Sequence, residues 1–247
     1  MGANYFKYAF LKNFIKKPVY LIFFITSKCN SKCRHCFYWD NLNKFTNELN
    51  LDEINKFSKQ LKHIEWLTLS GGEPFIRKDI YEICKIFYKN NGVKSLTIPT
   101  NGLLTEKIKN DVEKISGLGL DVSINLSLDG LEKTHDFIRG IKGSFKKILK
   151  TYYELVKLKK RFSNLYVRVN TTINNKNYKE VRVLDNFIKE KMPLIDSHNF
   201  EFMRGNPKDK SFRALNVKEI EELQNEIFDI RKSYEFFNSK IKSRLAD

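Results

Sequence analysis

The chain alternates short apolar runs, rich in β-branched residues, with longer stretches in which apolar residues recur every three or four positions. The short runs are typical of buried strands and the longer ones of amphipathic helices. The pattern predicts six strands, over Val19–Thr26, Trp66–Ser70, Ser95–Pro99, Val122–Leu128, Leu165–Ile173 and His198–Met203. It predicts six helices, over Leu51–His63, Lys78–Asn90, Thr105–Ser116, Ser144–Arg161, Tyr178–Lys191 and Val217–Leu245.

Six strands that are each followed by a helix favour βαβ units and a parallel α/β sheet with right-handed crossovers. A closed barrel needs eight such units, and the 247 residues leave no room for two more. Either an open six-unit barrel or a doubly wound sheet fits this count. No linker rich in Pro, Gly or Ser interrupts the pattern, so residues 17–247 are expected to form one domain. Residues 1–16 are expected to form an N-terminal arm, packed on the domain as a helix rather than anchored at a membrane surface.

The composition is that of a globular protein with an excess of positive charge. Hydrophobic residues make up 41% and charged residues 30%, which excludes the disordered and collagen-like classes. The formal net charge is +16, but only ten of the 45 cations are Arg, and the Lys are spread along the predicted helices. This distribution favours solvated helix faces over a nucleic-acid footprint, so an anionic partner is permitted and not required. No apolar run reaches the roughly 20 residues of a membrane-spanning helix, and a cytoplasmic protein without a membrane span is expected.

Three of the four cysteines, Cys29, Cys33 and Cys36, follow the first predicted strand with C-x3-C-x2-C spacing. Loops at this end of parallel strands carry the chemistry of α/β proteins, and three thiolates so close together can hold one metal centre. A structural zinc site needs four ligands, and His35 is the nearest candidate for the fourth. A disulfide would leave one thiol of the three unpaired. On a four-iron cube, three thiolates leave one iron open to a small molecule. Cys84 lies in a predicted helix and is interpreted as a core residue.

Further motifs follow the next strands in order. They are Ser70-Gly71-Gly72-Glu73-Pro74, Thr100-Asn101-Gly102, Ser127-Leu128-Asp129-Gly130 and His135-Asp136-Phe137-Ile138-Arg139-Gly140. Together with the cysteines, they make the chain from about residue 19 to 205 resemble a radical S-adenosylmethionine (SAM) enzyme. The subgroup it resembles contains molybdenum-cofactor, peptide-modifying and sulfatase-maturing members. The fold implied is α/β, a partial (open) six-unit (β/α)6 TIM-like barrel.

The resemblance implies two cofactors, a [4Fe–4S] cluster and SAM. The cluster ligands would be Cys29, Cys33 and Cys36. The residues expected to contact SAM are His35, Tyr38, Gly71, Gly72, Glu73, Thr100, Ser127, Asp129, Arg139, Asn170 and Met203. No residue is assigned as catalytic.

Each of these residue types has a physical reason to contact SAM. Two glycines allow a backbone to approach a ligand without a Cβ clash, and Glu73 can accept the ammonium of the methionine moiety. Arg139 suits the carboxylate, because a guanidinium forms bidentate pairs. The short polar groups at the mouths of the third, fourth and fifth strands suit ribose or methionine. Thr100, Ser127, Asp129 and Asn170 supply them.

Planar and apolar side chains are expected near the adenine. The family favours an aromatic residue before the third cysteine, and His35 stands there, so a planar ring is kept. Tyr38 follows the third cysteine, and Met203 ends the last predicted strand. On that strand, alternation separates Asn199, Glu201 and Met203 from His198, Phe200, Phe202 and Arg204 without deciding which set faces inward.

The resemblance implies reductive cleavage of SAM at the cluster to give a 5′-deoxyadenosyl radical. This radical would abstract hydrogen from a peptide or a small metabolite, and the electron would come from a donor such as a flavodoxin or ferredoxin. Three alternatives stay open: an RNA-modifying radical SAM enzyme, a metal-binding nucleic-acid module without SAM cleavage, and a scaffold with a degenerate SAM site. No cysteine follows Cys84, so this chain is not expected to hold auxiliary clusters.

Overall fold

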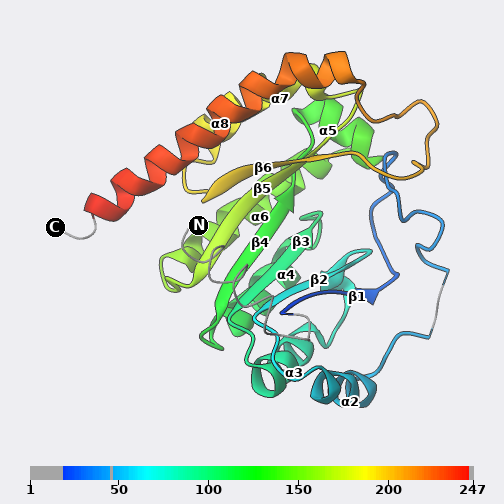
Figure 1. Ribbon diagram of the computed structural model, residues 1–247, viewed down its shortest axis with the longest axis vertical. Helices are drawn as coiled ribbons and strands as arrows, with labels where there is room; N and C mark the ends of the chain where they lie inside the picture. The colour runs from blue at the N-terminus through cyan, green and yellow to red at the C-terminus, as the bar shows by residue number, and fades with distance from the viewer. Residues whose placement is uncertain (1–18, 45–46, 245–247) are drawn as a thin grey trace.

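The computed structural model describes residues 19–44 and 47–244, shown in colour in Figure 1. The expected N-terminal arm, residues 1–16, lies outside them. No helix within these ranges is long and apolar enough to cross a membrane.

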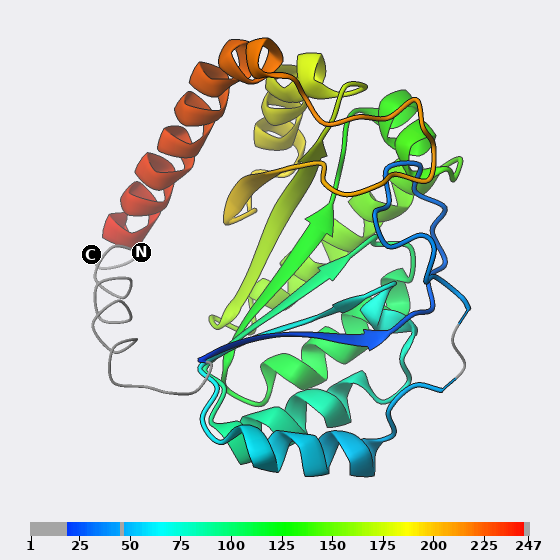
Figure 2. The same ribbon diagram turned by 45° about the vertical axis from the view of Figure 1, so that its right-hand side comes forward.

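The core of the fold is one parallel sheet whose six strands lie in the order of the sequence. Its strands are β1 (Tyr20–Thr26), β2 (Trp66–Gly71), β3 (Ser95–Thr100), β4 (Asp121–Ser127), β5 (Leu165–Ile173) and β6 (Ser197–Phe202). The sheet is curved, and β1 and β6 form its two unjoined edges (Figure 2). A doubly wound sheet would reverse its strand order at a switch point, and this one does not. The predicted open (β/α)6 barrel is therefore confirmed, and the doubly wound sheet is wrong.

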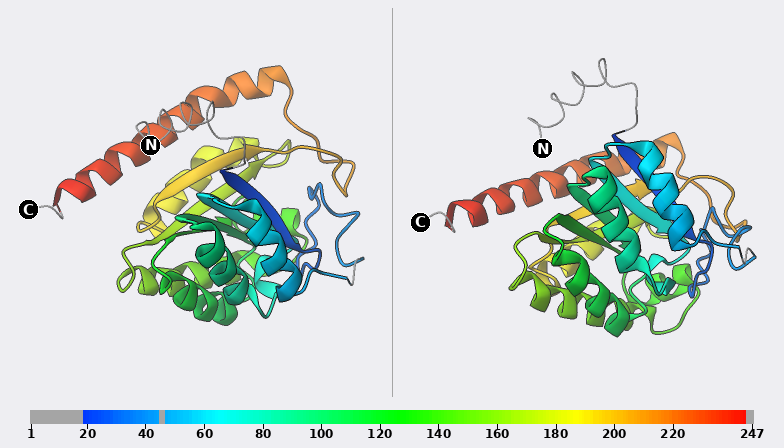
Figure 3. Two further views of the ribbon diagram at one scale, coloured as in Figure 1. Left: turned by 60° about the horizontal axis from the view of Figure 1, so that its bottom comes forward. Right: turned by 90° about the horizontal axis from the view of Figure 1, so that it is seen from below.

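The helices follow the strands and lie largely on one side of the sheet (Figure 3). They are α2 (Leu51–Leu61), α3 (Ile80–Asn91), α4 (Thr105–Ser116), α5 (Glu132–Arg139), α6 (Ser144–Lys159), α7 (Val181–Lys191) and α8 (Val217–Arg244). Two short 3-10 helices, η1 (Pro74–Ile76) and η2 (Tyr178–Glu180), precede α3 and α7. The six predicted helices agree with the structure to within a few residues, and α5 was not predicted. It is only two turns long, and no side chain caps its first turn.

Alternation along the strands gives the sheet a buried apolar face and a concave face that is mostly polar, apart from Tyr20, Ile22 and Phe24 of β1. On β5, Leu165, Val167 and Val169 are buried, and they belong to the core that the helices cover. The residues between them, including Arg168 and Asn170, are half-buried and face the concave side. A closed barrel fills this interior with branched apolar side chains. The open barrel instead carries polar groups there, which leaves space in front of the sheet.

A buried polar network fastens the last strand to the last two helices. His198 on β6 lies 3.0 Å from Asp185 Oδ1 through Nδ1 and 2.9 Å from Thr171 Oγ1 through Nε2. Asp185 on α7 also accepts from Tyr234 Oη of α8 at 3.3 Å and pairs with Lys189 at 2.8 Å. Burial lowers the pKa of His198 and keeps the ring neutral, so Nδ1–H donates to the carboxylate.

We predict that Asp185→Asn destabilises the protein by about 2 kcal/mol, because Asp185 is buried and its charge-assisted hydrogen bond with His198 would be lost. Urea unfolding followed by circular dichroism measures this free energy. Glu113→Gln is the matched control, because Glu113 pairs with Arg161 at the exposed surface, and its cost should stay within about 0.5 kcal/mol. Equal costs for the two variants would show that the Asp185 network does not hold α7 and β6 together.

Candidate functional site

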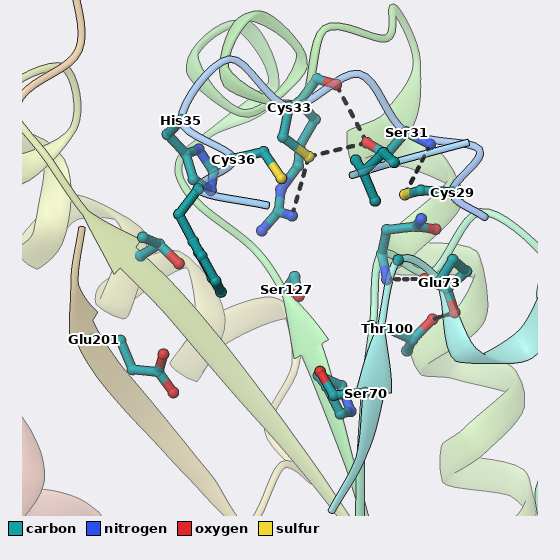
Figure 4. Close-up of a pocket in the computed structure, with 18 of the residues that line it drawn as sticks. Cys29, Ser31, Cys33, His35, Cys36, Ser70, Glu73, Thr100, Ser127 and Glu201 are labelled. Carbon is teal, nitrogen blue, oxygen red and sulfur yellow. Dashed lines mark hydrogen bonds between the residues drawn. The ribbon is translucent and has the colours of Figure 1, made fainter. Parts of the chain in front are cut away.

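A cleft opens at the carboxyl ends of the strands, beneath the loop that carries the cysteines (Figure 4). Its cavity volume is about 200 Å³. The lining comes from the ends of β2 to β6, the cysteine loop and α5. Figure 4 shows the sulfur atoms of Cys29, Cys33 and Cys36 on the side of the loop that faces the strand ends.

The cysteine loop has no regular secondary structure between β1 and Asn43, so contacts to its neighbours hold its shape. On one side it accepts backbone hydrogen bonds from the end of β2: Gly72 N donates to Thr26 O and Glu73 N to Lys28 O. On the other side, Lys32 N and Arg34 N donate to the last carbonyls of α5, at 3.2 and 2.8 Å. The segment after β6 also contacts the loop, because Asp209 N donates to Arg34 O at 2.9 Å and Trp39 Nε1 to Asn206 O at 3.1 Å. The loop is thus held by three segments that are far apart in the sequence.

Glycines allow the contacts with β2 and α5. A Cβ on Gly71 would lie 2.2 Å from Thr26 O, and one on Gly72 would lie 2.1 Å from Lys28 O. On the α5 side, a Cβ on Gly140 would lie 2.5 Å from Lys32 O. Gly71 and Gly72 line the cleft, but the space that their side chains would occupy belongs to the end of β1 and to the cysteine loop. The sequence interpretation, in which these glycines make room for a ligand, needs this correction.

Hydrogen-bond donors surround the cysteine sulfurs. Ser31 N donates to Cys29 Sγ at 3.4 Å, and Ser31 Oγ lies 3.1 Å from Cys33 Sγ. Arg139 Nη1 donates to Cys33 Sγ at 3.5 Å. All three cysteines are free thiols. Donors of this kind stabilise thiolates and tune the iron–sulfur clusters that thiolates hold.

The three thiols of the cysteine loop are a donor set for a metal centre. Burial raises the pKa of Cys29 to about 12 and also raises that of Cys36, so these groups ionise only when a cation binds them. Thiolates are the ligands of iron–sulfur clusters, so three free thiols on one loop fit such a cluster.

A buried ion pair connects the cysteine loop to β4. Arg139 Nε lies 2.7 Å from Asp129 Oδ2, and Asp129 is fully buried. Burial acts to raise the pKa of Asp129, but Arg139 and the nearby histidines outweigh it, and the pKa is lowered. Asp129 also accepts from Thr172 N at 2.9 Å. Asp129 therefore faces Arg139 and the backbone of β5, and it is absent from the lining of the cleft.

Glu73 is the centre of a second buried group of hydrogen bonds. Its carboxylate accepts from Thr100 Oγ1 and Asn101 N, each at 2.8 Å, and from Phe75 N at 3.3 Å. Burial raises the pKa of Glu73 to about 7 despite these donors. The Thr100 hydroxyl, which was predicted to contact SAM, is directed to Glu73 instead. Glu73 orders the ends of β2 and β3, and both residues line the cleft.

Most of the predicted site residues line this one cleft. They are Cys29, Cys33, Cys36, His35, Gly71, Gly72, Glu73, Thr100, Ser127, Arg139 and Met203. Three others do not: Asp129 lies behind Arg139, Tyr38 packs edge-on against Phe24 at 5.3 Å, and Asn170 lies on the inner face of β5 beyond Thr172.

Ten lining residues are not among the predicted contacts, and the polar ones are Ser31, Ser70, Asn101, Thr172, Glu201 and Arg204. Alternation could have found Thr172, which shares a strand face with Asn170. Nothing in the sequence marks the hydroxyl of Ser31 as a partner of Cys33.

Comparison with known proteins decides the family. Residues 23–188 match the model of the radical SAM superfamily, which is more than half of the chain. The chain belongs to the radical SAM superfamily. Radical SAM proteins use a [4Fe–4S] cluster and SAM, and the cleft described above lies within or beside the matched segment.

Relatives of known function resemble the chain over only part of their length. Fe-coproporphyrin III synthase of Methanosarcina barkeri is 31% identical over 183 residues, which are 73% of this chain and 43% of the relative. GTP 3′,8-cyclase of Helicobacter pylori is 30% identical over 204 residues, 81% of this chain and 60% of the relative. The chain thus spans about half the length of the curated relatives that it matches.

Solved structures support the radical SAM fold. SuiB of Streptococcus suis bound to S-adenosylmethionine superposes with a TM-score of 0.68 and 22% identity, covering 92% of this chain and 51% of SuiB. The protein anSMEcpe with bound AdoMet superposes with a TM-score of 0.69 and 20% identity, covering 90% of this chain and 62% of that one. At these identities the likeness establishes the fold alone.

We predict that Gly72→Ala lowers the iron bound after anaerobic reconstitution to a small fraction of the wild-type amount. The new methyl group would overlap Lys28 O and push the cysteine loop away from β2. Iron and acid-labile sulfide per chain provide the measurement. Gly117→Ala is the control, because Gly117 has a helical φ of −66° and its nearest Cβ neighbour would be 3.3 Å away. Full iron loading of Gly72→Ala would contradict the argument.

We predict that the cluster-free protein loses stability as the pH falls from about 6.5 toward 4. Burial lowers the pKa of His135 to about 4 and also lowers that of His198. The fold favours the neutral rings, so their contribution is complete above pH 6.5. It is lost below that value, by up to about 1.4 kcal/mol per pH unit for each ring.

Urea unfolding between pH 7.5 and 5 tests this dependence. His135→Asn should make it shallower, because the amide oxygen can replace Nδ1 as the acceptor for Asp129 N and does not titrate. His63→Asn, which changes an exposed ring, should leave the profile unaltered. An unchanged slope in His135→Asn would assign the acid sensitivity to other groups.

Proposed function

We propose that this chain is the SAM-cleaving part of a radical SAM enzyme, with Cys29, Cys33 and Cys36 as the ligands of a [4Fe–4S] cluster. One observation carries the proposal: three free thiols, the Gly-Gly-Glu turn and a buried arginine line a single cleft at the carboxyl edge of an open barrel. Ligand sites of α/β proteins lie at this edge. When bound, the cluster supplies the electron that cleaves SAM into methionine and a 5′-deoxyadenosyl radical.

The residues around the cysteine loop would bind SAM and orient it. Arg139 Nη1 donates a hydrogen bond to Cys33 Sγ and stabilises its thiolate, and Ser31 Oγ lies 3.1 Å from the same sulfur. Asp129 fixes the guanidinium of Arg139 through Nε, which leaves Nη2 for the carboxylate of SAM. Asp129 is therefore proposed as a positioning residue rather than a contact of SAM.

The remaining lining residues would complete the pocket for SAM. Glu73 keeps acceptor capacity for an ammonium group beside the three donors that it already holds. Ser127 at the mouth of β4 offers a hydroxyl. His35 and Met203 also line the cleft and would pack against the adenine. Tyr38 and Asn170 lie outside the cleft, so their contacts with SAM stay predictions.

We propose a peptide or a small metabolite as the substrate and a flavodoxin or ferredoxin as the electron donor. Two structural neighbours support a peptide: SuiB was solved with its precursor peptide SuiA, and anSMEcpe with bound AdoMet and a Cp18Cys peptide. A cytoplasmic location belongs to the same proposal, because thiols stay reduced there. The alternative of a nucleic-acid module without SAM cleavage has only the net charge of +16 in its favour.

We predict that the anaerobically reconstituted protein forms 5′-deoxyadenosine from SAM with dithionite. Single Cys→Ala changes at Cys29, Cys33 and Cys36 should each abolish both the iron–sulfur absorption and the product. Cys84→Ala should keep both, because Cys84 is buried in α3 away from the cleft. Chromatography and visible absorption provide the two measurements.

Two outcomes would contradict the proposal in different ways. Absorption that survives the three cysteine changes would remove the ligand assignment. A stable cluster in the wild-type protein that does not cleave SAM would leave the scaffold with a degenerate site as the better description.

A further inference from the structure

The arginines divide into two groups by their partners. Eight of the ten have described side chains, and six of these eight lie within 4 Å of a carboxylate. Arg168 and Arg204 have no acidic partner among the described residues. Both belong to the open barrel, one on its inner face and one at its mouth. Each therefore carries a positive charge that no carboxylate of the described residues neutralises.

Arg204 belongs to the cleft already described. It lines the cleft, and its guanidinium lies 5.2 Å from the centre of the Phe37 ring. Arg168 is different, because it lies outside that lining, on β5. Its guanidinium is 5.7 Å from the centre of the Tyr166 ring, which shares the same strand face. This contact holds the cation on the concave side of the sheet without neutralising it.

The surroundings of Arg168 are polar and short of acidic groups. Its partners across the ladder are Asn125 on β4 and Ser197 on β6. Asn125 Oδ1 is buried, and no hydrogen-bond donor from the described part of the chain reaches it. A buried acceptor without a donor is costly, and a ligand with an N–H or O–H group would satisfy it.

The acids at the starts of the neighbouring strands are used elsewhere or are too distant, and Glu201 lies four residues, about 13 Å, along β6 from Ser197. Asp196 accepts from Lys159 and from Val167 N, each at 2.7 Å. Asp121 lies at the opposite end of β4, four residues and about 13 Å along the strand from Asn125. None of these carboxylates comes within 4 Å of Arg168, so its fork of donors stays available for a planar anion.

We propose that Arg168 receives a carboxylate or phosphate group of the substrate, so that the substrate class is anionic. This deepens the proposed function and rests on it. Asn125, beside Arg168, is two residues and about 7 Å from Ser127, which lines the cleft. A small molecule therefore reaches from Arg168 to the cleft, where SAM would be cleaved. The net charge of +16, which the SAM site does not explain, attracts such a substrate from solution.

Anion binding to the reconstituted, SAM-loaded protein tests the proposal by calorimetry at constant ionic strength. The probes are glutarate, inorganic phosphate and the neutral analogue glutaramide. Arg168→Gln should weaken glutarate or phosphate binding about tenfold or more, because a charge-assisted hydrogen bond is lost. Arg168→Lys should retain part of the affinity. The anion that binds more tightly shows whether the site prefers a carboxylate or a phosphate, and glutaramide should not bind.

Arg182→Gln is the matched control. It also removes one positive charge, but from an exposed arginine on α7 that pairs with Glu226 and Asp229. The affinity of this variant for glutarate or phosphate should stay within twofold of the wild-type affinity. Unchanged binding in Arg168→Gln, or equal losses in both variants, would overturn the proposal, because general attraction by surface lysines would then explain the affinity.

The outcome is separable from that of the proposed function. Wild-type protein that cleaves SAM but shows no binding that depends on Arg168 would remove the anion site alone. Anion binding that depends on Arg168, in a protein that never forms 5′-deoxyadenosine, would keep the anion site and remove the reaction.

Discussion

The site depends on how closely three backbone segments approach one another. The cysteine loop has no helix or strand of its own, and its hydrogen bonds run to the end of β2, to the end of α5 and to the segment after β6. Gly72 and Gly140 make the approaches to β2 and α5 possible, because any side chain at either position would collide with a loop carbonyl. The placement of the three sulfurs is thus determined by glycines that have no functional group, and these glycines constrain the site as strongly as the ligands do.

Charge is organised around one buried arginine. Arg139 ends α5, pairs with Asp129 beyond β4 and donates to Cys33 Sγ. It therefore connects a helix, a strand end and the cysteine loop through one planar group. Its positive charge keeps Asp129 ionised and, with burial, keeps His135 neutral. Because the same group joins the fold to the proposed cluster site, the local structure and the electrostatics of that site cannot be altered separately.

The sequence predicted the strands well because hydrophobic alternation is a local signal. It did not predict α5, whose two turns carry too few apolar positions to show a period. Most of the residues predicted from the motifs line one cleft, but the side chains of Asp129 and Tyr38 point elsewhere. Asp129 faces Arg139, and Tyr38 packs on Phe24. A motif places the Cα atom near the site, whereas the direction of the side chain depends on partners from distant segments. The pairing of Ser31 with Cys33 could not be read from the sequence for the same reason.

The strand order of the sheet has a consequence for how the protein assembles. Each strand pairs with the next one along the chain, so the barrel can grow by successive short-range steps. The cysteine loop is the exception, because Ser31 bonds to the carbonyl of Arg139, 108 residues away. That contact has to wait until four strands and α5 are in place. A cluster held by this loop would therefore be inserted late, into a nearly finished barrel, and chain collapse would not depend on the supply of iron.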